Sequence, residues 1–164
     1  MTDRRDSSVK SQTHDVLQLV SFMIGKEEFG VDILKVQEIN RMVEITRVPN
    51  APAFVSGVIN LRGKVIPIVD LRKRFGTGKE ENDKDTRIIV VELTGKVIGF
   101  IVDAVNEVLR IPKSVTEPPP PIVAGIGSEY IHAVAKLEDR LLILIDLEKI
   151  LHATEKDALV EVAA

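Results

Sequence analysis

The sequence contains no cysteine and no tryptophan among its 164 residues. Without cysteine the chain has no disulfide, thiolate nucleophile or cysteine metal site, and nothing in it requires an oxidising compartment. A cytoplasmic location is therefore expected. The polar residues 2–15 lack the apolar stretch of a secretory leader, and the longest apolar runs are much too short to span a bilayer. We accordingly expect no direct membrane insertion.

Aromatic residues are also scarce, and the chain has no excess of positive charge. Aromatics make up only 4% of the chain, and the formal net charge is −3. The chain therefore lacks both the stacking platform of single-strand binders and an overall attraction to a phosphate backbone. A small barrel that binds nucleic acid is still the rival function, because such barrels often bind oligonucleotides. Salt-dependent retention on single-stranded DNA would distinguish that rival from a protein-binding role.

The residue patterns of catalytic and metal sites are missing as well. His14, His132 and His152 are scattered and form no ligand spacing. The segment 76–79, Gly-Thr-Gly-Lys, resembles a phosphate loop, but Lys73 and Glu80 stand where that motif needs glycine and serine or threonine. We expect no enzyme activity and no cofactor or metal; an enzyme is the weakest alternative.

What the sequence does contain is a series of strand-like segments. Apolar residues make up 45% of the chain and alternate with polar ones in short runs broken by turn residues. Four hairpins are predicted, over 16–33, 58–69, 87–102 and 130–145. Asp70 is predicted to cap a short helix that ends at Gly76.

The remaining segments are read as connections and tails. The polar segment 76–86 has the composition of an exposed loop and is predicted as a soft boundary between two halves. Prolines 118–121 predict an extended connector. Residues 1–15 are interpreted as a flexible tail and residues 155–164 as a C-terminal helix or tail. The folded domain is therefore expected to cover residues 16–154.

The two halves repeat one another. In the early part of each half, a glycine is followed at the same spacing by a valine, a glutamate and an aliphatic residue, with an offset of 69 positions. In the later part the offset is 76. The matched residues are Gly30, Val36, Glu38 and Ile39 with Gly99, Val105, Glu107 and Val108, and Val58, Leu61, Asp70, Leu71 and Lys73 with Val134, Leu137, Asp146, Leu147 and Lys149.

This repeat predicts a mostly β fold. Each half should form its own curled, five-stranded sheet, closed into a barrel that hides its edges. The run 141–145 is apolar at successive positions, which indicates strands buried on both faces. The two barrels should therefore pack together, and their shared groove is the expected place for a partner.

Several residues allow both a structural and a binding interpretation. Asp70 and Asp146 follow strands and most simply cap the next short helix. Arg62 beside Gly63 could bind a partner carboxylate or be merely solvated. Val36 and Val105 are more often packing residues than contacts. The matched carboxylates, Glu38 and Glu107, should point outward as charges at the rim of an interface.

Four segments of the chain resemble the chemotaxis coupling proteins of the CheW type. They are 29–39, 55–72, 103–109 and 135–144, and the stretch Gly-Val-Ile-Asn-Leu-Arg-Gly-Lys-Val-Ile-Pro over 57–67 is the most specific. The resemblance implies a pair of SH3-like five-stranded barrels with short helices. It also implies a free-standing adaptor that links methyl-accepting chemoreceptors to the regulatory domain of the histidine kinase CheA.

The resemblance further implies two surfaces. A kinase-binding surface would contain Val36, Glu38, Gly57 and Val58. A receptor-binding groove between the barrels would contain Arg62, Val105 and Val108, and would accept the helices of the receptor tip. The substitution Gly57→Asp is accordingly expected to lose kinase binding.

Overall fold

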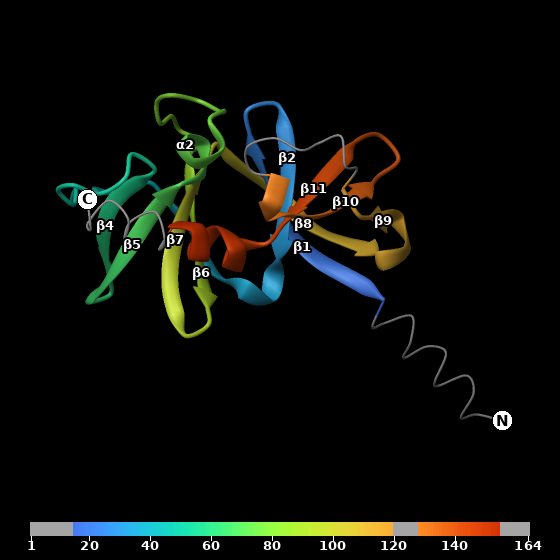
Figure 1. The fold of residues 1–164 in the computed structure, drawn as a ribbon, viewed down its shortest axis with the longest axis horizontal. Helices are drawn as coiled ribbons and strands as arrows, with labels where there is room; N and C mark the ends of the chain where they lie inside the picture. The colour runs from blue at the N-terminus through green and yellow to red at the C-terminus, as the bar shows by residue number, and fades with distance from the viewer. Residues whose placement is uncertain (1–14, 120–127, 155–164) are drawn as a thin grey trace.

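The computed structural model describes residues 15–119 and 128–154, and it is mostly β (Figure 1). The predicted tail 1–15, except Asp15, part of the proline connector and the segment 155–164 lie outside these residues. The strands are β1 (Val16–Ile24), β2 (Glu27–Asp32), β3 (Val36–Arg41), β4 (Val55–Leu61), β5 (Lys64–Asp70), β6 (Arg87–Leu93), β7 (Lys96–Val102), β8 (Ala104–Pro112), β9 (Thr116–Glu117), β10 (Ile131–Lys136) and β11 (Leu141–Ile145). Short helices join them: η1 (Ile33–Lys35), α2 (Leu71–Phe75), η2 (Lys113–Val115), η4 (Ser128–Tyr130) and a last helix that begins at 147 and continues to 154.

Local chemistry sets the turns and helix starts. Arg62 and Gly63 both have positive φ, 52° and 84°, as a type I′ hairpin turn requires. The Asp70 carboxylate accepts a hydrogen bond from the Arg72 amide at 3.0 Å, and α2 ends at Gly76 in the left-handed region. The Asp146 carboxylate accepts the Glu148 amide in the same way at 3.0 Å. The capping roles predicted for both aspartates are confirmed.

The strands form two sheets that lie side by side (Figure 1). Sheet A has the order β8-β1-β2-β11-β10-β9, and sheet B has the order β3-β6-β7-β5-β4. Replacing β3, β6, β7, β5 and β4 by β8, β1, β2, β11 and β10 turns the order of sheet B into the first five strands of sheet A, and the short β9 is the sixth strand of sheet A. The two sheets therefore have the same SH3-like topology, and the predicted fold class is confirmed.

The expectation that each half of the chain forms its own sheet is wrong. The hairpin β1–β2 belongs to the first half of the chain but lies in sheet A between β8 and β11 of the second half. The hairpin β6–β7 belongs to the second half but lies in sheet B between β3 and β5 of the first. Strand alternation specifies which face of a strand is buried but not which strand it pairs with, so the repeat could not reveal this exchange of hairpins.

The strand registers reproduce the repeat. Val36 pairs with Val91 in sheet B. Val105 lies 69 positions after Val36, Phe22 lies 69 positions before Val91, and these two residues pair in sheet A. The parallel pairs correspond in the same way: Ile68 lies opposite Gly99, and Leu144 lies opposite Gly30. The two sheets are thus related by a pseudo-two-fold arrangement of strands.

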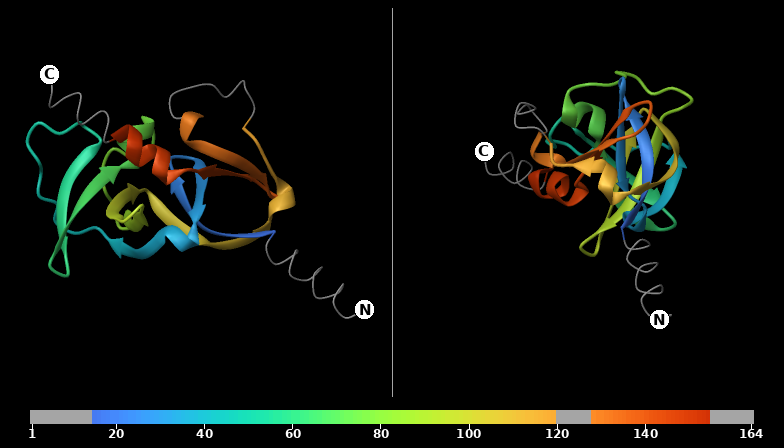
Figure 2. Two further views of the ribbon diagram at one scale, coloured as in Figure 1. Left: turned by 60° about the horizontal axis from the view of Figure 1, so that its bottom comes forward. Right: turned by 90° about the vertical axis from the view of Figure 1, so that its right-hand side faces the viewer.

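A single core joins the two sheets. Its largest cluster includes Phe22 of sheet A and Phe100 of sheet B, exposed by 0% and 1%. Ile150 of the last helix is also fully buried in this cluster, and Figure 2 shows this helix (red) over the junction of the sheets. Burial of each large aliphatic or aromatic side chain is worth about 1.5–3 kcal/mol, so this shared cluster is a main source of stability for both sheets.

The loop between the halves is exposed from residue 79 to residue 85, as predicted. It is nevertheless anchored: the Lys79 amide donates to both carboxylate oxygens of buried Asp103 at 3.2 Å. Because strands from both halves build each sheet, this loop does not separate two independent barrels.

Candidate functional site

Glu38 and Arg62 form an ion pair on sheet B. Glu38 lies on β3 and Arg62 at the tip of the β4–β5 hairpin, and the Arg62 guanidinium donates to the Glu38 carboxylate. The Arg62 side chain is 76% exposed, whereas that of Glu38 is only 20% exposed. Glu38 therefore does not point freely outward as the sequence suggested, because the hairpin tip folds over it. The structure brings together two residues that the resemblance assigned to different surfaces.

Exposed aliphatic side chains lie on the same two elements. Ile39 follows Glu38 on β3 and is 40% exposed, and Val65 follows the hairpin tip on β5 and is 71% exposed. Their counterparts in sheet A, Val108 and Leu141, are 55% and 59% exposed. Exposed apolar side chains at matched places in both sheets are a feature of protein-binding surfaces.

The charge pair also has a counterpart in sheet A. Arg140, in the β10–β11 turn, lies 3.3 Å from Glu107 of β8 and 2.6 Å from Glu28 of β2. Burial raises the pKa of Glu28, but the hydrogen bonds of Arg140, Ser21 and Asn106 and the charge of Arg140 together outweigh this, and the net pKa is below the usual 4.5. Glu107, with a side chain 56% exposed, points outward as predicted.

Gly57 and Val58 lie where sheet B closes on itself. Val58 forms two hydrogen bonds with Thr46, from its amide at 2.8 Å and to its carbonyl at 2.9 Å, and these join β4 to the chain that leaves β3. Val134 occupies the matched place in sheet A and pairs with Glu117 of β9, which follows β8. The same closure therefore occurs in both sheets.

Gly57 is required by this closure. Its φ is +143°, and a Cβ atom there would lie 2.0 Å from the Thr46 carbonyl oxygen. No side chain fits at that distance, so Gly57→Asp would disturb the backbone as well as any surface. The matched residue, Ala133, is buried and follows the same register shift in β10. Gly57 therefore has a structural role that the sequence did not reveal.

Val36 and Val105 lie behind these surfaces. Both are partly buried and pack against the shared core cluster. Val108 is exposed by 55% on β8 and pairs with Val20 of β1. A cavity of about 280 Å³ lies where Leu93 of sheet B meets sheet A and the last helix, but its lining does not include Arg62, Val105 or Val108.

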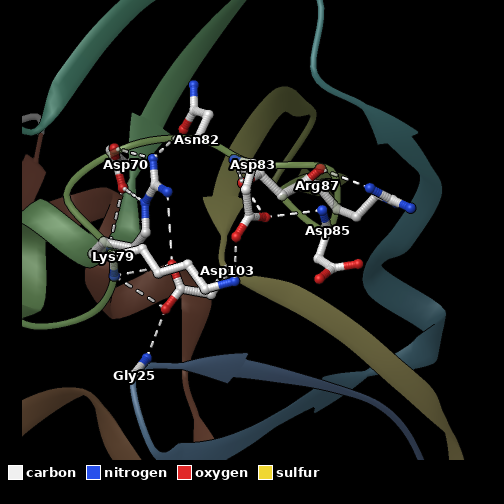
Figure 3. A network of polar contacts seen from close by, with 10 residues as sticks. Gly25, Asp70, Lys79, Asn82, Asp83, Asp85, Arg87 and Asp103 are labelled. Carbon is white, nitrogen blue, oxygen red and sulfur yellow. Dashed lines mark hydrogen bonds and ion pairs between the residues drawn. The ribbon is translucent and has the colours of Figure 1, made fainter.

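A buried polar cluster at the junction of the sheets was missed by the sequence reasoning. Arg72 of α2 is 5% exposed and makes two hydrogen bonds of 3.0 Å to the Asp70 carboxylate. Its guanidinium also lies 3.6 Å from Asp103, and it donates to the Asn82 side chain at 2.6 Å. Figure 3 shows Gly25, whose amide donates to Asp103 at 2.7 Å, approaching from the β1–β2 turn.

This cluster joins α2, the β7–β8 junction, the β1–β2 turn and the loop between the halves. Burial lowers the pKa of Arg72, but Asp70 and Asp103 raise it by more, so the guanidinium stays charged. Only the spacing of Asp70 and Arg72 was visible in the sequence; Asp103 is distant in the chain. The cluster holds the two sheets together and offers no free nucleophile or base.

Within residues 15–119 and 128–154, no group of three or more histidine, aspartate or glutamate side chains is arranged to hold a metal ion. None of the helices in those ranges is long and apolar enough to cross a membrane.

Comparison with known proteins identifies the family. Residues 18–155 match the family described as CheW-like domain. The chain belongs to the CheW-like domain family. The chemotaxis protein CheW of Klebsiella aerogenes is 40% identical over 88% of this chain and 86% of its own length. The Helicobacter pylori chemotaxis protein CheW is 37% identical over 88% and 87%.

A solved structure supports the same assignment. The scaffolding protein TtCheW of Thermoanaerobacter tengcongensis superimposes with a TM-score of 0.75 and is 46% identical, covering 79% of this chain and 88% of its own. The resemblance to the CheW-type proteins that was seen in the sequence is thus confirmed.

Proposed function

We propose that this chain is a non-enzymatic adaptor that couples chemoreceptors to the histidine kinase CheA in chemosensory arrays of the cytoplasm. It binds the regulatory domain of the kinase and the cytoplasmic tip of the receptor. Membership of the CheW-like family supports a scaffolding role in chemotaxis. The observation that carries the proposal is the Glu38–Arg62 ion pair on sheet B, because it is specific and accessible, and the two elements that form it also carry the exposed side chains of Ile39 and Val65.

The kinase contacts centre on Glu38. Val36 lies partly buried behind it and supports β3. Gly57 and Val58 contribute indirectly, by closing sheet B at Thr46. Arg62 orients the Glu38 carboxylate and lies at the edge of the surface, where it is free to contact a partner as well.

The receptor contacts centre on Val108 of sheet A. Its exposed side chain suits an apolar contact with a receptor helix, whereas Val105 packs inward and holds β8 in place. Arg62 lies on sheet B and Val108 on sheet A, so Arg62 would contribute to receptor coupling from sheet B.

A charge swap tests the kinase surface. Glu38→Arg should weaken binding of the isolated regulatory domain about 10- to 100-fold, the usual effect of losing one central contact. The double variant Glu38→Arg with Arg62→Glu restores the internal ion pair but reverses the charges offered to the partner. Binding should therefore stay weak in the double variant. Full recovery would mean that the pair only maintains the fold. Glu81→Arg, in the exposed loop, is the matched control.

Kinase autophosphorylation with receptor membranes tests the coupling itself. The wild type should raise phosphorylation, and Val108→Asp should lose this rise while still binding the regulatory domain. Thr94→Asp, in an exposed turn of sheet B, is the control. Full activation by Val108→Asp would overturn the receptor surface. No activation by the wild type with cognate components would overturn the adaptor function.

A further inference from the structure

Strand pairing between the two halves of the chain is extensive. We define the first half as residues 15–78 and the second half as residues 86–154. Pairings within a half are the hairpins β1–β2, β4–β5, β6–β7 and β10–β11, together with β9–β10. The remaining pairings of the described strands, β1–β8, β2–β11, β3–β6 and β5–β7, all cross from one half to the other. Neither half can complete a sheet without the other.

The covalent link between the halves is the loop 79–85. Its residues are exposed, and most of its interactions are local: the Lys79 side chain contacts the Asp83 carboxylate at 2.6 Å, the Asp83 amide donates to the Thr86 hydroxyl at 2.8 Å, and the Arg87 guanidinium donates to the Lys84 carbonyl at 2.7 Å. Its contacts with more distant residues include the Lys79 amide on Asp103 and the side-chain contact of Asn82 with Arg72. These few contacts are small beside four strand interfaces.

We propose that two copies of this chain exchange their halves, with the loop 79–85 as the hinge, to form a symmetric dimer. The first half of one copy pairs with the second half of the other in the registers of the monomer. The four crossing interfaces and the buried Arg72 cluster are re-formed between chains, so the exchange changes only the loop and the entropy of association. Exchange of an identical element is a low-cost route to dimers, and the dimer is favoured by concentration.

The exchanged dimer differs from the monomer in the number of binding surfaces that one particle presents. Each pair of sheets in it retains one Glu38 surface and one Val108 surface, so one dimer offers two of each. This inference does not depend on which partner those surfaces bind.

The absence of cysteine allows a direct test in the full chain. Gln18 on β1 and Arg110 on β8 are directly opposite in the register, and both are exposed. Opposite residues in antiparallel strands have Cα atoms about 4.5–5.5 Å apart, which suits a disulfide. Gln18→Cys and Arg110→Cys are made as separate variants, and the fold of each is checked by circular dichroism.

The two variants are mixed, unfolded in denaturant and refolded at a series of protein concentrations, with oxidised glutathione as the oxidant. The expected product is a disulfide dimer of twice the 18.1 kDa chain mass, with a yield that rises with concentration. Peptide mass spectrometry identifies a bridge between positions 18 and 110. The double variant in one chain should give the same bridge within a monomer, which verifies the geometry.

Gln18→Cys mixed with Lys64→Cys is the collision control, because Lys64 is exposed on the other sheet. At least a fivefold excess of the 18-to-110 bridge over this control is expected at the highest concentration. Equal yields in the two mixtures at every concentration would overturn the exchange.

Discussion

The closure of sheet B makes a quantitative prediction for Gly57→Ala. The added Cβ would lie 2.0 Å from the Thr46 carbonyl oxygen and 2.8 Å from its carbon, so the backbone must move until the contact reaches at least 3.0 Å. Positive φ in a non-glycine residue costs about 1–3 kcal/mol. The two hydrogen bonds between Thr46 and Val58 contribute about 0.5–1.5 kcal/mol each, and both are weakened by that movement. We expect the free energy of unfolding to fall by about 4 kcal/mol, a large share of the usual 5–15 kcal/mol.

The assay is denaturant unfolding followed by circular dichroism, with Gly63→Ala as the matched control. Gly63 also has positive φ, +84°, but a Cβ there meets no atom within 4 Å. The control therefore measures backbone strain alone, at about 1 kcal/mol. Hydrogen exchange should also accelerate at the Thr46 and Val58 amides in Gly57→Ala only. Equal destabilisation by the two substitutions, within about 0.5 kcal/mol, would refute the steric reasoning.

Three further predictions concern stability. Arg72→Met should lower the free energy of unfolding by about 4 kcal/mol because it leaves two buried carboxylates unpaired, and adding Asp103→Asn should recover part of this loss in the same denaturant assay. Gly99→Ala should lower the free energy of unfolding by about 2 kcal/mol, more than the matched Gly30→Ala. A Cβ at position 99 would meet side chains at 2.6 and 2.8 Å, whereas one at position 30 would meet them at 3.1 and 3.3 Å, and equal shifts of the melting temperature would contradict this. The lowered pKa of Glu28 adds stability above pH 4.5, and this stability is lost as the pH falls through the pKa of Glu28 in the folded protein. Glu28→Gln should therefore lower the free energy of unfolding by about 1 kcal/mol at neutral pH. When stability is measured against pH, the variant should also lose less of it on acidification than the wild type does.

The sequence was informative wherever the physical signal is local. The Arg62-Gly63 turn, the helix caps and the repeated spacing of Glu38 and Glu107 could all be read directly, because each depends on a few neighbouring residues. These features predicted the hairpins, the two-sheet fold and the family.

The features that the sequence did not reveal depend on contacts between distant residues. Alternation in β1 cannot distinguish β8 from β3 as its neighbour, so the exchange of hairpins was not predicted. The role of Gly57 depends on the path of Thr46, and that of Arg72 depends on Asp103 from the other half. For the same reason Glu38 was expected to be free, since its partner lies at the tip of a separate hairpin.

The exchange of hairpins also determines the order in which a ribosome can complete the two sheets. Sheet B needs no residue beyond Val102, whereas sheet A must wait for Ile145. At about 5–20 residues per second, the intervening 43 residues (145 minus 102) take about 2–9 seconds to synthesise. During most of that interval β1–β2, the first hairpin made, can pair with β8 but lacks β11, the strand that flanks it on its other side. The earliest segment of the chain is therefore the last to be enclosed, and a pause in synthesis before β11 would expose it for longest.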